Sequence, residues 1–181
     1  MARRIVESPA TGEQFTFDDD WNTPRGEVGR IDYVLHPKHA VPPHFHPGVA
    51  QSFEVLTGRL HISVSGRTST LTAGETAKTA LGEVHAQWNE GPATVYTVEY
   101  YDPPIAIEPF FTVLPCALGT KNPCKLAVFL ADFATITSLL PFRLRLLRAL
   151  APLARLCGFK MWYRPILAAA GLTWPPPPAA P

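Results

Sequence analysis

The chain has 181 residues, of which 46% are apolar, and its formal net charge is +1. These values are ordinary for a soluble globular protein that buries its own core, and they give no indication of a nucleic-acid partner. The three cysteines are odd in number and show no CxxC spacing, so neither a disulfide framework nor a zinc ribbon is predicted. No apolar run follows the two arginines near the N-terminus, so we expect no signal peptide and, by default, a cytoplasmic location.

Residues 1–26 are polar and are interrupted by several glycines and prolines, so we expect an N-terminal arm. Beyond it, short segments in which apolar and polar side chains alternate predict β-strands separated by glycine turns. The expected strands cover residues 28–36, 59–65, 68–72, 76–80, 84–89 and 93–101, with a further hairpin between the first two. Short strands at regular intervals favour a sandwich or a barrel.

Residues 109–173 are predicted to form a helical extension that packs on the barrel or on a partner. Asn122 is a capping side chain followed by proline, and apolar side chains then recur at helical spacing, so we expect a helix over 123–138. Pro141 opens a second expected helix, in which leucines alternate with arginines. Pro152 should kink or end this second helix.

Charge is distributed unevenly along the chain. Residues 1–132 carry ten basic and fifteen acidic side chains, a formal balance of −5, whereas the remainder carries six basic side chains and no acid. The simpler interpretation is that the basic helices lie against the acidic surface of the barrel or of a partner, and the sharper alternative is contact with a membrane surface. A transmembrane span is not expected, because the apolar stretch 126–142 contains Asp132 and is shorter than the ~20 residues required. Residues 174–181, with five prolines, are predicted to be disordered.

Two short patterns about forty residues apart predict a metal site. Alternate side chains of a β-strand share a face, so His44 and His46 point the same way. Gln51 begins the next expected strand, and His85 belongs to a later one. Three imidazoles and an amide carbonyl are suitable donors for one divalent transition metal. The alternatives are ordinary half-exposed strand histidines and, for Gln51, a polar strand residue that binds no metal.

The same residues resemble a known family. The stretch from His44 to Gly58 resembles the first signature of the cupin superfamily, in which His-x-His, an acidic ligand and a glycine follow in order. The second signature is matched by Gly74, Gly82, His85 and Asn89. The chain departs from the signatures at Lys38, Ala80 and Gln51, where the family usually has glycine, proline and glutamate. The resemblance implies an all-β fold, a double-stranded β-helix or jelly-roll barrel over residues 27–108, and commonly a homodimer.

The neutral donor set favours non-redox chemistry. Three histidines and a glutamine cancel none of the +2 charge of a metal, which makes it a stronger Lewis acid and disfavours the higher oxidation states of oxygen activation. Cupins that ketonise unsaturated uronates resemble this chain in their metal shell and carry a functional aspartate at the position of Glu99. Cupin hydroxynitrile lyases also use three histidines and a glutamine, around manganese. The sequence does not decide whether the metal is Mn, Fe, Ni or Zn.

We therefore expect an isomerase, lyase or cyclase that acts on a small, partly hydrophobic, carbonyl-bearing metabolite. Glu99 and Tyr101 are the predicted catalytic residues, and an outward, solvated Glu99 is the alternative. The predicted substrate-binding residues are Phe45, Phe53, Val55 and Gln87, because the interior reads as apolar and aromatic. Two other functions stay open: a metal-dependent dioxygenase, and a ligand-binding module without turnover.

Overall fold

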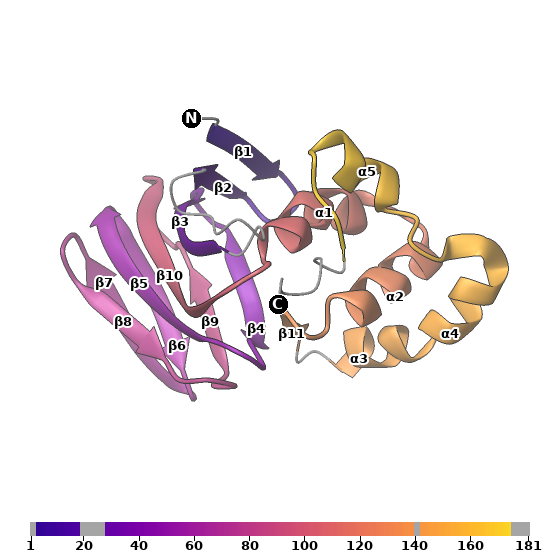
Figure 1. Ribbon diagram of the computed structural model, residues 1–181. Helices are drawn as coiled ribbons and strands as arrows, with labels where there is room; N and C mark the ends of the chain where they lie inside the picture. Colours follow the sequence, from indigo (N-terminus) through magenta and orange to yellow (C-terminus); the bar gives the residue numbers. More distant parts are fainter. Residues whose placement is uncertain (1–2, 19–27, 140–141, 175–181) are drawn as a thin grey trace.

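The computed structural model describes residues 3–18, 28–139 and 142–174, and its strands form two antiparallel sheets (Figure 1). The first sheet has the order β1 (Arg3–Ser8), β2 (Glu13–Asp18), β3 (Val28–Leu35), β10 (Val95–Ile105), β5 (Ala50–Thr57) and β8 (Thr76–Thr79). The second has the order β11 (Ser138–Leu139), β4 (Ala40–Phe45), β9 (His85–Trp88), β6 (Arg59–Val64) and β7 (Arg67–Thr72). The all-β fold with a C-terminal helical extension is confirmed.

Alternation along the strands fills the space between the sheets. In β5 every second residue from Gln51 to Val55 is buried, so Gln51, Phe53 and Val55 point inward while Ser52 and Glu54 between them are half-exposed. Leu60 and Ile62 do the same on β6 of the opposite sheet. The polar Gln51 at one end of this inward row and the apolar residues after it divide the interior into a polar end and a packed core.

The prediction of an N-terminal arm is wrong for residues 3–18, which form part of the first sheet. Within it, β1 and β2 are strands of the first sheet, and β2 pairs with β3 so that Phe15 lies opposite Tyr33. Phe15 and Phe17 are 1% and 0% exposed, which explains why this segment joins the sheet. Gly12 supplies the positive φ (65°) of the turn between the two strands. Residues 19–27 of the predicted arm lie outside the described residues.

The extension consists of short helices on one side of the barrel (Figure 1). They are α1 (Glu108–Gly119), α2 (Pro123–Asp132), α3 (Phe142–Ala149), α4 (Ala151–Ala154), a π-helical turn (Arg155–Phe159) and α5 (Arg164–Ala169). The described helices include none that is both long enough and apolar enough to cross a membrane.

The start of α2 is confirmed, but its end is not. The Asn122 side chain accepts hydrogen bonds from the backbone N–H groups of Cys124 (2.9 Å) and Lys125 (3.3 Å), as a cap should. The helix ends at Asp132 instead of near residue 138, because the chain turns there and pairs with β4 as β11. Helix α1 begins with a proline after Glu108 and contains another inside it, so helical spacing alone did not reveal it.

Several contacts join the extension to the barrel. The carboxylate of Glu108, at the start of α1, accepts hydrogen bonds from Arg4 Nε (2.5 Å) and Nη2 (3.0 Å) on β1. The ring of Phe111 stacks on Phe15 with centroids 3.8 Å apart. The pairing of β11 with β4 is a third contact. The helices therefore pack on the barrel of the same chain.

The end of the extension folds back on α2. Trp174 stacks on Phe133 with centroids 4.6 Å apart, and its Nε1 donates a hydrogen bond to the carbonyl of Asp132 (3.2 Å). This residue was included in the predicted disordered tail, and its packing corrects that assignment. The remaining tail, residues 175–181, lies outside the described residues.

The Phe15–Phe111 stack yields a prediction about stability. Replacing Phe111 by Ala should lower the free energy of unfolding by about 3 kcal/mol, since it removes a buried ring between β2 and α1. The matched control is Phe142→Ala on α3, where the ring is 75% exposed and the change should stay within about 0.5 kcal/mol. Urea unfolding followed by circular dichroism measures both. Equal effects of the two substitutions would contradict this account of how the extension is held.

Candidate metal centre

Three histidines, from β4, the position after it and β9, meet at the polar end of the barrel. His44 lies on β4 opposite His85 of β9, and His46 follows directly after β4. One ring nitrogen of each lies within 4.8 Å of the others, and all three side chains are buried. Three imidazole nitrogens this near to one another can converge on one cation. The three predicted histidines are therefore brought together.

Hydrogen bonds fix how the three rings are oriented. The Nδ1 atoms of His44, His46 and His85 lie 2.9, 2.8 and 3.1 Å from the carbonyl oxygens of Pro42, Ile136 and Glu83. A carbonyl only accepts, so each Nδ1 carries the hydrogen and each Nε2 keeps its lone pair. The Nε2 atoms of His46 and His85 are buried without a hydrogen-bond partner among the described residues. Unpartnered lone pairs that converge are what a bound cation would satisfy.

Burial keeps the rings neutral, as metal ligands must be. Desolvation is the largest cause that lowers the pKa of His46, to about 4, and the same cause lowers the pKa of His44 and of His85. The neighbouring imidazoles lower the pKa of His44 further, because a second positive charge in the cluster is unfavourable. The cluster therefore offers uncharged nitrogen donors at neutral pH.

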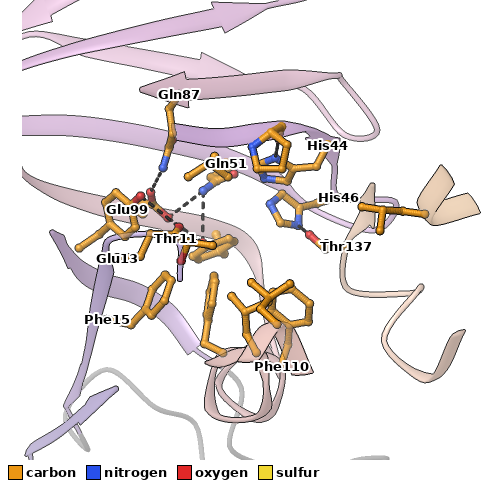
Figure 2. Close-up of a pocket in the computed structure, with 18 residues that line it drawn as sticks. Thr11, Glu13, Phe15, His44, His46, Gln51, Gln87, Glu99, Phe110 and Thr137 are labelled. Atoms are coloured by element: carbon orange, nitrogen blue, oxygen red, sulfur yellow. Dashed lines mark hydrogen bonds between the residues drawn. The ribbon is translucent and has the colours of Figure 1, made fainter. Parts of the chain in front are cut away.

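Gln51 adds an uncharged oxygen donor. Its Nε2 donates hydrogen bonds to Glu99 Oε2 (2.9 Å) and to the hydroxyl oxygen of Tyr101 (3.2 Å), which fixes which end of the amide is the nitrogen. Its Oε1 is buried and has no hydrogen-bond partner within the part of the chain that is described. Figure 2 shows this amide between Glu99 and the imidazoles of His44 and His46. The donor set fits a divalent transition metal with three nitrogen ligands and one amide oxygen.

Glu99 is buried behind Gln51 and does not face solvent. It is 2% exposed, and it accepts hydrogen bonds from Gln51, from the Tyr101 hydroxyl (2.8 Å) and from Gln87 Nε2 (3.2 Å). Burial raises the pKa of Glu99, and the three hydrogen bonds oppose this rise. Burial also raises the pKa of Tyr101 well above its ordinary value, so this hydroxyl keeps its proton. Glu99 therefore points inward, as expected, and the alternative of an outward, solvated Glu99 is wrong.

A cavity of about 160 Å³ opens in front of these residues. Its polar wall includes Gln87, as expected. Phe45, Phe53 and Val55 are absent from the described lining, which corrects their predicted placement. Phe45 lies between His44 and His46 on the strand and so faces away from the cavity, whereas Phe53 and Val55 point inward but belong to the packed core.

The apolar wall comes from segments that the sequence analysis did not assign to the site. Phe15 of β2 and Phe110 of α1 lie across the cavity from Gln51 (Figure 2). Further lining residues from outside the predicted set are Thr11, Glu13, Tyr33, Val41, Pro42, Phe111, Leu114, Leu118, Thr137 and Leu144. The period-two pattern of Glu13, Phe15 and Phe17 was the available signal for the β2 residues.

Glu13 is a second buried carboxyl in this cavity. It is 6% exposed, and the Tyr33 hydroxyl donates a hydrogen bond to it (3.1 Å). Burial raises the pKa of Glu13 to about 7, against the lowering effect of hydrogen bonds from Thr11 and Tyr33, and the nearby charge of Glu99 raises it further. A carboxyl with this pKa exchanges its proton near neutral pH.

Comparison with known families agrees with this geometry. The family model described as a cupin domain matches residues 32–99, which span β3 to β10 and contain every proposed metal ligand. The chain contains a cupin domain. Its two antiparallel sheets are the cupin double-stranded β-helix, and the histidine cluster lies inside it.

Solved structures resemble the cupin barrel at low sequence identity. An RmlC-like cupin from Shewanella frigidimarina is 18% identical, covers 54% of this chain and 81% of its own, and has a TM-score of 0.44. A predicted oxalate decarboxylase from Thermotoga maritima is 18% identical over 56% of this chain and 91% of its own (TM-score 0.45). A sugar phosphate isomerase of the cupin superfamily from Silicibacter pomeroyi is 18% identical over 56% and 70% (TM-score 0.46). Among curated proteins, no significant match is found. These likenesses concern the fold alone.

The histidine cluster leads to a prediction about metal content. The double variant His44→Ala/His46→Ala should lose bound metal, because two of four donors are removed, while the cupin barrel stays folded. The matched control is His36→Ala/His61→Ala, which removes two histidines outside the cluster and should keep wild-type metal content. Elemental analysis after reconstitution with Mn, Fe, Ni or Zn and removal of free ions measures both. Equal metal content in the two variants would contradict the site.

The carboxyl of Glu13 leads to a prediction about pH. The folded protein holds this proton more tightly than the unfolded chain, so the free energy of unfolding should fall as pH rises from about 4.5 to about 7 and then level off. Glu13→Gln should remove about 2–3 kcal/mol of this fall while it keeps the acceptor for Tyr33. The variant Glu7→Gln, on the exposed face of β1, should follow the wild type. Urea unfolding across this pH range is the measurement, and a Glu13→Gln profile identical to wild type would refute the assignment.

Proposed function

We propose that the protein is a metal-dependent enzyme for non-redox proton transfer, such as an isomerisation, elimination or cyclisation of a carbonyl-bearing metabolite. The observation that carries the proposal is the contact between Glu99 and Gln51. It places a buried carboxylate one side chain away from the histidine cluster and on the wall of a cavity. A polarising centre next to a base is the arrangement that such reactions require.

The donor set supports non-redox chemistry. A divalent metal held by His44, His46, His85 and Gln51 would supply Lewis-acid polarisation of a substrate oxygen, with its charge uncancelled by the protein. The hydrogen bonds to the Nδ1 atoms of the histidines hold the rings in place before any substrate arrives. This preorganisation supports tight and specific metal binding.

Glu99 is suited to act as the base. Its Oε2 accepts two hydrogen bonds, from Gln51 and Tyr101, whereas its Oε1 accepts one, from Gln87 at 3.2 Å. Oε1 therefore keeps a lone pair for a substrate proton. Because burial raises the pKa of Glu99, this carboxylate is a stronger base than an exposed one. Tyr101 and Gln87 hold it in one orientation.

Glu13 is suited to return a proton on the other side of the cavity. Its pKa of about 7 means that both protonation states are populated near neutral pH. Thr11 and Tyr33 fix its position from β1–β2 and β3. Two carboxyls with different surroundings in one cavity support distinct acid and base roles.

The walls support a substrate that is polar at one end and apolar at the other. Phe15 and Phe110 face the polar groups across the cavity (Figure 2), and Phe111 also lines it. These rings offer no partner for the hydroxyl groups of a sugar. The cavity of about 160 Å³ is close to the engineered cavities of about 150 Å³ that hold benzene. An aryl or short alkyl ketone, aldehyde or related carbonyl compound is the substrate class that fits.

Proton abstraction next to a carbonyl can be tested before the natural substrate is identified. The metal-reconstituted protein should catalyse exchange of α-protons for deuterium in aryl and alkyl ketones, followed by NMR in heavy water. Glu99→Gln should keep its metal and lower the exchange rate by about 10²–10⁴-fold, because the base is removed. Glu54→Gln, a half-exposed carboxylate on β5, is the control and should retain wild-type rates.

Two outcomes of this experiment would replace the proposal. Oxygen uptake by the anaerobically iron-loaded protein with catechols or flavonoids, without deuterium exchange, would identify a dioxygenase. Saturable ligand binding without exchange or oxygen uptake would identify a ligand-binding cupin. Full exchange activity of Glu99→Gln would exclude Glu99 as the base.

A further inference from the structure

An exposed apolar stripe runs along α3, α4 and the π-helical turn that follows. We call it the α3–α4 stripe, and its residues recur at intervals of four, four, three and three positions; Phe142 and Leu146 share one face of α3. It consists of Phe142, Leu146, Leu150, Leu153 and Leu156, which are 75, 59, 51, 61 and 86% exposed. Half of the exposed large hydrophobic residues of the described chain lie here, so the stripe is a concentrated patch and not scattered exposure.

The stripe is the outer face of helices whose inner face is already used. Leu144 and Leu147 are the half-buried leucines of α3, and α3 contains no buried residue. Ala151 and Ala154 are the buried residues of α4, at 1% and 2% exposure. The packing of the extension therefore does not account for the leucines on the opposite face.

Three positive charges lie on α3, the helix in which the stripe begins. Arg143, Arg145 and Arg148 are exposed on α3, and within the described residues no salt bridge involves them. Arg155 pairs with Asp132 inside the extension. The last acidic residue of the chain is Asp132, so the whole segment after it carries cations only. The barrel's acidic surface does not neutralise these three arginines in the part of the chain that is described.

We propose that the α3–α4 stripe docks on an anionic membrane surface. A basic amphipathic helix lies in the plane of such a surface, with its apolar side chains below the headgroups and its cations among them. Arg143 and Arg145 stand one position away from the stripe residues Phe142 and Leu146, where they would meet lipid phosphates. No charge of the segment opposes this contact.

A second copy of the chain is a poorer occupant. In a symmetric dimer the same patch meets itself, so stripe-on-stripe packing would bring the arginines of both copies together without an acidic partner from either segment. An anionic bilayer supplies both the apolar layer and the negative charge. The observations therefore favour lipid.

Docking would also place the cavity next to the membrane. Leu144, on the face of α3 opposite the stripe, lines the cavity that contains Glu99. The same helix would then contact lipid on one side and the apolar wall of the site on the other. A ligand with an apolar part is concentrated in the bilayer, so this position would favour its capture.

Vesicle co-sedimentation of the full chain tests the proposal. The protein should sediment with phosphatidylcholine vesicles that contain phosphatidylglycerol and not with pure phosphatidylcholine vesicles. Salt of about 1 M should weaken binding strongly, because it shortens the screening length to about 3 Å. Arg143→Gln/Arg145→Gln/Arg148→Gln should weaken binding by at least about tenfold, since each basic residue near an anionic surface contributes about fivefold.

A matched pair of variants separates the stripe from net charge. Leu146→Glu/Leu153→Glu should weaken vesicle binding by at least about tenfold, because it places two carboxylates in the docked face. Leu56→Glu/Leu81→Glu changes net charge equally at barrel leucines that are 47% and 62% exposed, and it should change binding by less than about twofold. Circular dichroism checks that both variants stay folded.

Several results would overturn the proposal. These are an absence of sedimentation with anionic vesicles, equal sedimentation with both vesicle types, and equal loss of binding in the two leucine variants. Light scattering tests the alternative that a second copy of the chain packs on the stripe. A wild-type dimer that becomes a monomer only in Leu146→Glu/Leu153→Glu would assign the stripe to an interface between copies of the chain.

Discussion

The hydrogen bonds of the Gln51 amide are the interactions on which the arrangement of the site depends. Its nitrogen donates to Glu99 and Tyr101, so its oxygen is left for the histidine cluster. A glutamate at this position would place a second carboxylate within hydrogen-bonding distance of Glu99, and two adjacent buried charges repel. A neutral amide at position 51 is therefore compatible with the buried carboxyl of Glu99. An amide would leave the positive charge of a bound metal uncancelled, and it adds no second negative charge beside Glu99.

The cavity is built from parts of the chain that are distant in sequence. The cupin barrel supplies the polar wall through β4, β5, β9 and β10, while β2 and α1 supply the aromatic wall. The salt bridge between Arg4 and Glu108 and the stack of Phe15 on Phe111 join these outer segments to each other. The extension thus forms part of the wall of the cavity.

Helix α3 of the extension has one face toward the cavity and another that is exposed. Helix α3 borders the cavity with one face and exposes the α3–α4 stripe with the other. Its arginines find no acidic partner among the described residues, although the barrel has an excess of acids. Segregation of apolar and basic side chains on a short exposed helix is typical of a surface that meets lipid headgroups.

The sequence by itself determined the barrel, the three histidines and Gln51, because strand alternation and the spacing of the cupin signatures are local patterns. It also determined the cap of α2, which depends on Asn122 and the backbone N–H groups of Cys124 and Lys125. Only the tertiary structure decided that β2 and α1 wall the cavity, that Phe45 faces away from it, and that Glu13 lies buried beside Tyr33. The reason is physical: a local pattern states which face of an element is apolar, but burial, the pKa of a carboxyl and the walls of a cavity depend on which distant segments pack against that face.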